Sequence, residues 1–579
     1  MRISYVKIKN YRNLDDTSIV FDPDMNFLVG ENDLGKSNVI DMLFTIFNGR
    51  RFFEDDFTDI EKAIEIEFSI ILSDIEKGVF DDYLDPDISE KTNVTAKQES
   101  IDEDIRYFHL ESGEEISYFK FRCLNYIKYD SLRTPKEELT FHRKRGVGKF
   151  LGYLVERCIS QETPHSGEDF INKEVLAPIV EYINSLLKKI RMLKEFDISA
   201  TAEEELNDLI FRILTIKDNK GFHIQKIGYG VQFSVLIVLS ILEKLMLIRE
   251  DKRKKDCIFS TNEESYISLI LGLDEPEIHL HPYMQRSIVK YIKGIIQNED
   301  DEFVSLVKVL FDIDKIDGQA IIVSHSPTIL LNQYRYVVRF YRENSKIKII
   351  SGSDIRLDES TEKHLLKNFS YIKEALFSRC AILVEGDTEY AALPLWSEKL
   401  IGDLDQLGIS VIQVGGSGSI PPVSRLLDEL KIPNVSIVDR DCYENNNTYY
   451  EQVDDLIITD HRDFEEELVE HLISKEKEGI LFEIVMEREF NGLDKEMQNL
   501  KIIQIADKYE INVSWEDKNY SFLEIKDSSS DKNLFKAMFL SWLDKKSILL
   551  GRTIGEIINK ELIPNRYKET IEQAKINAK

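Results

Sequence analysis

Apolar and polar residues alternate along the first 30 positions, which is the pattern of strands with one buried face. A glycine-rich stretch ends this alternation, and the apolar positions after it recur at helical spacing. The beginning of the chain therefore predicts a strand, a loop and a helix in that order. The strand positions are Ile3, Tyr5, Val6, Ile8, Ile19, Phe21 and 27–29, and the helical positions are Val39, Ile40, Leu43, Phe44 and Phe47.

The middle of the chain predicts the rest of this first domain, divided by an insertion. Residues 86–210 are mostly polar with helical spacing, and 170–195 has the pattern of an amphipathic helix. We expect 86–210 to form a helical arm between two lobes of the domain. Strand patterns occur at 60–75, 115–130, 267–273, 319–323 and 331–351.

A second α/β segment follows a helical stretch at 361–379. Apolar strands and helices alternate there, an order that builds a parallel sheet, and residues beyond 459 are mainly helical. The predicted fold class is α/β, with a domain boundary between 355 and 378. The strands are expected at 380–384, 410–414 and 435–438 with a helix at 420–430, and the expected segments are 1–85 and 211–360 for the two lobes, 86–210 for the arm and 375–579 for the second domain with its helical extension.

Charge restricts the surfaces on which a nucleic acid can bind. The 579 residues include 75 Lys and Arg against 105 Asp and Glu, a formal net charge of −30. With 42% hydrophobic residues the chain can bury real cores, which excludes a disordered, collagen-like or disulfide-scaffold protein. Because the acidic excess repels phosphate, any nucleic-acid surface must be local.

Cysteine usage and apolar runs indicate the compartment. None of the five cysteines forms a C-x-x-C pair, which favours a reducing compartment and argues against a structural zinc site. The N-terminus has no secretory apolar region. The apolar run 231–247 contains Glu243 and Lys244, which is typical of a buried helix and not of a membrane span. We expect a cytoplasmic protein without a membrane partner.

Residues 30–37 form a complete G-x-x-x-x-G-K-S loop between a predicted strand and a predicted helix. Its glycines let backbone N–H groups approach phosphates, Lys36 would bind the β- and γ-phosphates, and the Ser37 hydroxyl would bind Mg²⁺. The loop predicts an ATP site. Its candidate nucleotide-binding residues are Asn32, Gly35, Lys36 and Ser37.

An acidic pair at the end of another apolar strand fits the same site. Residues 267–273 lead directly into Asp274 and Glu275. Asp274 would hold Mg²⁺ through water, and Glu275 would polarise the attacking water. His325, also at the end of a predicted strand, is positioned to contact the γ-phosphate, although a single histidine is more often structural.

These motifs together resemble the ATPase head of the ABC, SMC and RecF-like class, and the opening run from Lys9 to Asn13 resembles the N-terminal motif of RecF-like ATPases. Residues 227–234, IGYGVQFS, correspond to the signature motif of that class but depart from its usual LSGGQ form. Two interpretations stay open for this segment. It completes the ATP site of a partner subunit, or it is simply a helix N-terminus.

Acidic residues also follow the strands of the second segment. Glu385 and Glu389 are four residues apart, so a helix between them brings both carboxylates to one site. Asp439 and Asp441 follow the strand 435–438, where alternation would place both on one side. Four such carboxylates repel one another and favour a hard cation such as Mg²⁺ or Mn²⁺. Two such ions bound side by side can catalyse phosphodiester cleavage. The alternative interpretation is that these residues are solvated acids at strand ends without a metal.

Residues 375–475 resemble the TOPRIM domain of topoisomerases, primases and related nucleases, and the glycine-rich residues 414–418 look like the loop after its second strand. The resemblance favours Glu465 as a further metal ligand. Asp463 and Glu466 are alternatives, and a solvated helix start is the other interpretation of this stretch.

An ABC-like head followed by a TOPRIM domain resembles the OLD (overcoming lysogenization defect) family of ATP-dependent nucleases. That family includes nuclease subunits of Gabija-type antiphage systems and effectors of some retron systems. The resemblance spans about 1–475. It implies a DNA endonuclease with metal in the TOPRIM site, regulated by ATP at the head, and a homodimer or homotetramer. It also implies a catalytic lysine, with Lys546 as the first candidate and Lys545 as the second.

Partners and alternative functions remain open at this level. A helicase, or a reverse transcriptase with its RNA–DNA product, is a candidate partner. A RecF- or SMC-like DNA-binding ATPase with a non-catalytic TOPRIM scaffold is the alternative function, although the intact acids argue against it. No domain for a topoisomerase is evident, and a primase would not usually carry the head. The basic clusters 142–149, 188–194 and 252–255 are either a DNA path or solvated loops.

Overall fold

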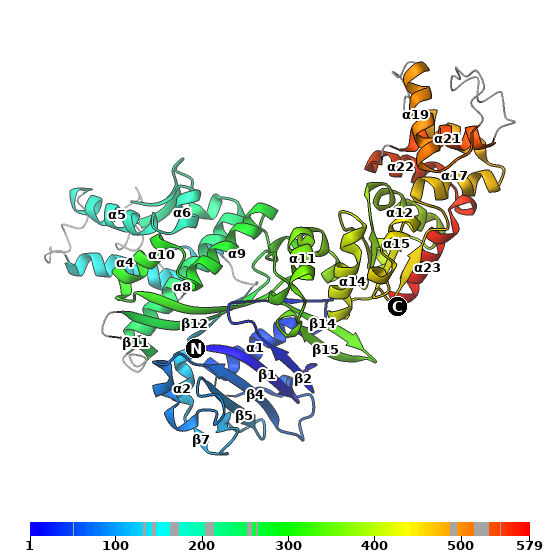
Figure 1. Ribbon diagram of the computed structural model, residues 1–579. Helices are drawn as coiled ribbons and strands as arrows, with labels where there is room; N and C mark the ends of the chain where they lie inside the picture. Colours follow the sequence, from blue (N-terminus) through cyan, green and yellow to red (C-terminus); the bar gives the residue numbers. More distant parts are fainter. Residues whose placement is uncertain are drawn as a thin grey trace. The chain divides into compact units, whose positions relative to one another are not determined.

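The computed structural model divides into two compact units, Met1–Asp354 and Ile355–Lys579, each described here by itself (Figure 1). Residues 355–360, which the sequence assigns to the first domain, belong to the second unit, because the helix that begins at Glu359 packs within that unit. The structure describes residues 1–49, 51–130, 135–141, 146–161, 173–202, 214–251, 257–261, 264–486, 495–513, 532–544 and 546–579.

The first unit contains an antiparallel sheet in the order β2-β1-β4-β5-β6-β7. Along β1 and β4, buried and partly exposed residues alternate, as the sequence pattern predicts for strands with one face on a core. The strands are β1 (Arg2–Lys9), β2 (Thr17–Val20), β4 (Ile64–Ile71), β5 (Lys91–Gln98), β6 (Arg106–His109) and β7 (Glu115–Ile116).

The predicted arm begins later than the sequence pattern suggests. Residues 91–129 form β5 to β8 and belong to the sheets, so the expectation of a helical 86–210 is wrong for this part. The buried side of β5 includes the polar residues Thr92 and Gln98, so the sequence shows no clear alternation of apolar and polar positions there. The helical part consists of α3 (Pro135–Glu138), α4 (Val147–Gln161), α5 (Lys173–Leu187) and α6 (Arg191–Glu195), followed by the hairpin strands β9 (Ile198–Ala202) and β10 (Leu214–Asp218).

A second, largely parallel sheet in the first unit runs β11-β12-β13-β3-β14-β15, and β8 also pairs with β12. Strands β8, β12, β13, β3 and β14 are parallel, whereas β11 and β15 are antiparallel edges. The carboxyl ends of the parallel strands therefore meet along one edge. The strands are β3 (Met25–Val29), β8 (Tyr126–Tyr129), β11 (Ile258–Ser260), β12 (Ser265–Asp274), β13 (Lys315–Val323), β14 (Val337–Glu343) and β15 (Lys346–Ser351).

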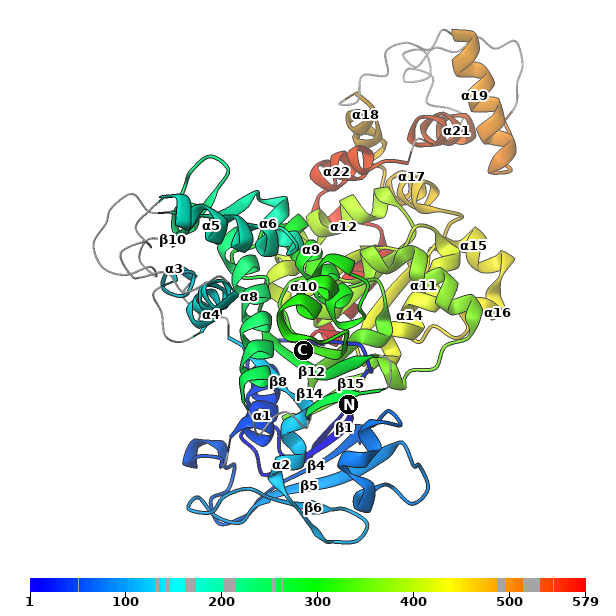
Figure 2. The same cartoon turned by 90° about the vertical axis from the view of Figure 1, so that its left-hand side faces the viewer.

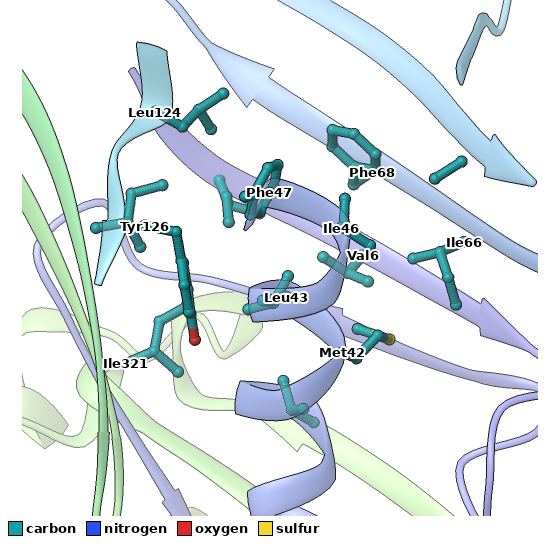
Figure 3. Close-up of a cluster of buried hydrophobic side chains, with 14 of the residues drawn as sticks. Val6, Met42, Leu43, Ile46, Phe47, Ile66, Phe68, Leu124, Tyr126 and Ile321 are labelled. Carbon is teal, nitrogen blue, oxygen red and sulfur yellow. The ribbon is translucent and has the colours of Figure 1, made fainter. Parts of the chain in front are cut away.

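Helix α1 (Lys36–Asn48) lies between the two sheets and fills the core of the first unit (Figure 3). Phe47 packs edge-on against Phe68 of the antiparallel sheet, with ring centroids 5.6 Å apart, and lies 6.0 Å from Tyr126 of the parallel sheet. Because both sheets hold α1, the loop immediately before it is fixed on a rigid support.

The apolar helix α8 (Tyr229–Glu250) is a core helix of the first unit. By length and composition it is the one helix among the described residues that could cross a membrane, but 83% of its apolar window is buried inside the protein. Helices α4 and α6 pack against it, as Figure 2 shows. Helix α10 (Asp301–Phe311) also contacts α8, and helix α9 (Pro282–Ile296) packs on β13.

The second unit is built on a parallel sheet in the order β17-β16-β18-β19. The strands lie close to the predicted positions: β16 (Cys380–Val384), β17 (Ile409–Gln413), β18 (Asn434–Val438) and β19 (Leu456–Ile458). All residues of β16 and β18 are buried, as central parallel strands require.

Helices cover this sheet and supply most of the remaining chain. The C-terminal helix packs on three of its strands, and Tyr567 of that helix contacts the Trp396 and Phe464 rings with centroids 5.4 Å and 5.3 Å away. The helices are α11 (Glu359–Ile372), α12 (Asp387–Leu400), α13 (Leu404–Leu407), α14 (Ile420–Glu429), α15 (Arg440–Asn445), α16 (Asn447–Tyr450), α17 (Phe464–Ser474), α18 (Glu478–Met486), α19 (Lys495–Lys508), α21 (Lys532–Leu543), α22 (Ile548–Ile557) and α23 (Asn565–Asn577).

Candidate functional site

The glycine loop joins β3 to α1 in the first unit, as the sequence predicts. Gly35 caps the helix with φ +81°, and a Cβ at Gly30 would lie 2.3 Å from the Phe340 carbonyl oxygen, so both positions need glycine. Lys36 Nζ donates to the Gly30 and Glu31 carbonyls at 2.9 and 2.6 Å. Burial lowers the pKa of Lys36 to about 8, although the Glu275 and Asp274 carboxylates oppose this shift.

The predicted partners of the loop lie beside it. Ser37 Oγ donates to Asp274 Oδ1 at 2.8 Å, which joins the first turn of α1 to the end of β12. Burial raises the pKa of Asp274. Glu275 follows with φ +45°, and its Oε1 lies 3.3 Å from His325 Nε2. Strands β12 and β13 are neighbours in register, which explains why residues 50 positions apart meet here.

A pocket of about 680 Å³ opens over these residues. Four of its lining residues were not among the candidate nucleotide-binding residues, namely Asn13, Asp33, Leu34 and Asn38. Asn38 Nδ2 donates to Asn13 Oδ1 at 2.8 Å. The pocket is large and polar enough for a nucleoside triphosphate. It is lined by Asn13, Asn32, Asp33, Leu34, Gly35, Lys36, Ser37, Asn38, Glu275 and His325.

Glu277 is a residue that sequence reasoning missed. It is 8% exposed and accepts hydrogen bonds from Ser324 Oγ at 2.7 Å and from the His325 backbone N–H at 2.8 Å. Its carboxylate therefore fixes the end of β13 and with it His325. Its position two residues after Glu275 was the feature of the sequence that could have identified it.

The segment 227–234 forms the start of α8. Gly228 is the N-cap, and a Cβ at Gly230 would lie 2.9 Å from the His279 carbonyl oxygen. The Tyr229 and His279 rings lie 5.6 Å apart. This helix start therefore packs against the loop after β12 within the same chain, and both interpretations of the segment stay open. Its contribution to a partner subunit stays a prediction.

In the second unit, the acids converge at the carboxyl edge of the sheet. Glu385 follows β16, and Gly386 is the N-cap of α12, so Glu389 lies in the first turn of that helix. The Asp439 backbone N–H donates to Glu385 Oε1 at 3.1 Å. Burial, with repulsion from Glu389, raises the pKa of Glu385 to about 7, and burial also raises the pKa of Asp439 and Glu389.

Glu465 and Lys546 complete this cluster. Glu465, in the first turn of α17, is 1% exposed, and burial raises its pKa to about 8. Lys546 Nζ lies 3.3 Å from Glu465 Oε2 and 3.4 Å from Asp439 Oδ2. Burial disfavours the charged Lys546, but the surrounding carboxylates outweigh this effect and raise its pKa. We call Glu385, Glu389, Asp439, Glu465 and Lys546 the carboxylate–lysine cluster.

The two alternatives to Glu465 have other roles. Asp463 caps α17 through the Glu466 N–H at 3.0 Å and accepts the Tyr509 hydroxyl at 2.6 Å. Glu466 pairs with Lys536 at 2.6 Å. Glu465 is therefore the member of this stretch whose carboxylate faces Lys546.

Asp441 lies differently from the prediction. The strand ends at Val438 and Asp441 belongs to the first turn of α15, so strand alternation does not apply to it. Its carboxylate lies 3.4 Å from Arg462 Nε. The glycine loop after β17 does adjoin the cluster, because the Gly416 N–H donates to the Glu385 backbone carbonyl at 3.1 Å.

Several basic candidates lie outside the described residues, namely 142–145, 252–255 and Lys545. The described cluster around 188–194 is partly neutralised. Lys194 pairs with Glu302 at 2.7 Å and Arg191 with Glu195 at 3.0 Å.

Comparisons with known proteins match domains in both units. The family described as AAA ATPase domain matches residues 1–145 and 133–330, more than half of the chain. The family described as the TOPRIM domain of overcoming lysogenization defect protein-like proteins matches residues 376–441. The Old nuclease of Escherichia phage P2 is 21% identical over 516 residues, which cover 80% of this chain and 79% of that protein.

Two further relatives cover parts of the chain. Endonuclease GajA of Bacillus cereus strain HuB5-5 is 22% identical over 386 residues, 61% of this chain and 52% of that protein. The SMC head domain from Thermotoga maritima, a solved structure, is 13% identical with a TM-score of 0.32, covering 62% of this chain and all of that one.

Fold and sites thus define an ATPase with a TOPRIM domain in the same chain. The protein belongs to the AAA ATPase domain family and, with its TOPRIM domain, to the OLD family of ATPase–TOPRIM nucleases.

Proposed function

We propose that the protein is a divalent-metal-dependent DNA endonuclease whose TOPRIM unit cuts or nicks DNA under the control of ATP bound at the first unit. The observation that carries the proposal is the carboxylate–lysine cluster. It concentrates three buried acids, Glu389, Asp439 and Glu465, and the partly buried Glu385 around one cation at the edge of a parallel sheet.

The cluster has the donors that a hard cation needs. Glu389 Oε2 and Glu465 Oε1 are buried without a hydrogen-bond partner, and Glu465 Oε2 has only the ion pair with Lys546. Buried acceptors are normally satisfied. Among the described residues, no three acidic, His or Cys side chains already have ligand geometry, so binding requires side-chain rotation. Mg²⁺ or Mn²⁺, when bound, would activate water and neutralise charge on the phosphate.

The residues of the chain then have separate roles. Glu385, Glu389, Asp439 and Glu465 would hold the metal, and Asp441 remains a candidate ligand that would have to leave Arg462. Lys546 is 44% exposed, so its ammonium can reach a DNA phosphate at the surface and stabilise the charge that develops there.

The nucleotide site would act as the regulator. Lys36 can exchange the loop carbonyls for phosphate oxygens, while Ser37 and Asp274 would hold Mg²⁺. Glu275 would orient water, with His325 beside the γ-phosphate. ATP binding at these residues would bias the activity of the second unit.

We further propose a cytoplasmic homodimer or homotetramer serving antiphage defence, with a helicase or a reverse transcriptase and its RNA–DNA product as partner. Similarity to GajA supports the role in defence. The intact carboxylate–lysine cluster argues against a DNA-binding ATPase with a purely structural TOPRIM domain.

The first test incubates supercoiled plasmid with the protein and Mg²⁺ or Mn²⁺, with and without ATP, beside Asp439→Ala. We expect metal-dependent nicking or cutting by the wild type and none by the variant. ATP binding should be equal in the two proteins. Full cleavage by Asp439→Ala would contradict the proposed metal site.

A further inference from the structure

Two buried cysteines of the first unit lie in contact although 134 residues separate them in the sequence. The Cys123 thiol donates to Cys257 Sγ at 2.7 Å. Cys123 is 5% exposed and Cys257 is 2% exposed, and both belong to the hydrophobic core of that unit. Packed carbon atoms, which are smaller than sulfur, lie about 3.5–4.0 Å apart. The two sulfur atoms are therefore closer than packing alone would bring them.

The pairing of two strands with β12 explains why these cysteines meet. Strand β13 occupies one edge of β12, and both β8 and β11 pair along the other edge. Strand β8 begins at Tyr126, which lies opposite Ile270 of β12. Strand β11 begins at Ile258, which lies opposite Ile267, a short distance earlier on β12. Each cysteine comes shortly before its strand, so both lie at the same place beside β12.

The sheet also fixes the backbone on both sides of the contact. Asn125, with φ +47°, lies between Cys123 and β8, and its Nδ2 donates to the Cys123 and Ser268 carbonyls, each at 3.0 Å. Ser268 belongs to β12, and Cys257 is followed directly by β11. The sulfur atoms need to approach by only about 0.65 Å, from 2.7 Å to the about 2.05 Å of a disulfide bond.

The two cysteines enclose the part of the chain that forms the helical arm. After β8 the chain passes through α3 to α6 and the β9–β10 hairpin, and after α8 it reaches Cys257 and β11. We call the contact between Cys123 and Cys257 the base of the arm. A bond between the two sulfur atoms would close a long loop there. In the chain-entropy account of cross-links, closing a long loop restricts the unfolded chain strongly and so stabilises the folded one.

We propose that Cys123 and Cys257 are a site of oxidative modification, at which a peroxide converts the two thiols into a reversible disulfide at the base of the arm. The inference goes beyond the proposed function and does not rest on it. In a reducing compartment, cellular thiols would reverse the bond by exchange.

The reaction uses one hydrogen peroxide and releases two waters. The sulfur of Cys123, the more exposed of the two, attacks one peroxide oxygen, the O–O bond breaks, and a sulfenic acid and water form. The sulfur of Cys257 then attacks the sulfur of Cys123, the S–O bond breaks, the S–S bond forms and the second water leaves. Both thiols are oxidised and the peroxide is reduced.

The test treats the full-length wild type with hydrogen peroxide, blocks the remaining thiols with iodoacetamide in denaturant and identifies peptides by mass spectrometry without reduction. We expect one cross-linked peptide pair, containing Cys123 and Cys257, that dithiothreitol separates. Absence of this pair, or a cross-link of either residue to another cysteine in its place, would overturn the proposal. This readout uses the wild type and does not depend on the folding of a variant.

Limited proteolysis tests whether the bond closes the base of the arm. A single cut between Cys123 and Cys257 divides the chain into two fragments. On a denaturing gel without reductant, the fragments should stay joined after peroxide treatment and separate after addition of dithiothreitol. Fragments that separate in the oxidised wild type without reductant would overturn the proposal.

Variants measure the effect on stability. Cys123→Ser and Cys257→Ser should each lose the cross-link, and the matched control is Cys380→Ala, which removes a buried cysteine of the second unit. Peroxide should raise the unfolding temperature of the wild type and of Cys380→Ala, and dithiothreitol should reverse the rise. A rise of the same size in Cys257→Ser would overturn the proposal, and circular dichroism before treatment verifies that each variant is folded.

Discussion

Glu465 shows how contacts distinguish one acid from its neighbours in a run of acids. Residues 463–467 are Asp, Phe and three Glu, and sequence alone left three candidates. Asp463 is occupied by capping and by Tyr509, and Glu466 by Lys536. Only Glu465 among these three is paired with Lys546.

Glu465→Gln should therefore lower metal-dependent cleavage at least about 100-fold, because it removes a proposed direct ligand, and outer-shell partners alone can matter that much. The measurement is the initial rate of plasmid nicking. Glu466→Gln is the matched control, and we expect its rate to stay near that of the wild type. Equal losses in the two variants would contradict the assignment.

His325 gives a prediction for pH. Burial lowers its pKa, and the nearby Lys36 charge adds to this effect while Glu275 opposes it. His325 is therefore neutral at pH 7, and a bound γ-phosphate would raise its pKa again. Binding then takes up a proton between these two pKa values, so affinity rises as pH falls through that interval.

The affinity for a non-hydrolysable ATP analogue should increase severalfold from about pH 7.5 to about pH 5.5, around the ordinary histidine pKa of about 6.5. Calorimetry in two buffers of different ionisation enthalpy measures both affinity and proton uptake. His325→Gln should lose the increase. An increase of the same size in that variant would exclude His325 as its source.

At the scale of elements, the contact between α12 and α22 supports the cluster. A Cβ at Gly551 of α22 would lie 2.1 Å from the Thr388 carbonyl oxygen and 2.9 Å from Ala391 Cβ. Thr388 precedes Glu389, and Lys546 lies just before α22. The close approach of these helices therefore positions both the Glu389 carboxylate and Lys546 in the carboxylate–lysine cluster.

Gly551→Ala should push the helices apart and destabilise the protein by about 1–3 kcal/mol, the usual cost of overpacking. Thermal unfolding and nicking rates should both fall relative to the wild type. Gly479→Ala, at an exposed position of α18 with nothing near its added Cβ, is the control and should leave stability equal or slightly higher. A neutral Gly551→Ala would show that the helices can separate freely.

The elements also show what the sequence can predict. Strands β16 and β18 and the loop before α1 are predicted well, because buried parallel strands are continuous apolar runs and phosphate loops need glycine at fixed spacing. Strand β5 was missed because its buried side carries the polar residues Thr92 and Gln98. The position of Asp441 depends on where β18 ends and α15 begins, and such boundaries are poorly encoded locally.

Long-range contacts were least accessible from sequence. Glu277 holds His325 across 48 residues, and Lys546 reaches Asp439 across 107. The local spacing of apolar and polar residues does not predict contacts between residues so far apart in the sequence. Lys546 was a candidate through family resemblance alone.

For the whole molecule, the two sites lie in separate units with separate cores. Lys36→Ala should weaken ATP binding strongly, because the buried ammonium is the cation of the phosphate loop. Metal-dependent cleavage without nucleotide should persist, and the effect of ATP on cleavage should disappear.

Nucleotide-binding and nicking assays on Lys36→Ala and the wild type measure ATP affinity and the effect of ATP on cleavage in parallel. Asp439→Ala is the reciprocal variant, which should keep ATP binding and lose cleavage. Loss of nucleotide-free cleavage in Lys36→Ala would mean that the loop supports the nuclease directly.

Lys546, α22 and α23 all lie near the C-terminal end of the sequence, which has a consequence for truncated copies of the gene. A copy truncated after about residue 475 would retain the phosphate loop and every acidic motif, and a motif search would still count it as a nuclease. Its protein would lack the only lysine described within the cluster and the helix that backs β16, β18 and β19. The crowded carboxylates would then lose the counter-charge of Lys546, so such pseudogenes should encode inactive, poorly folded products.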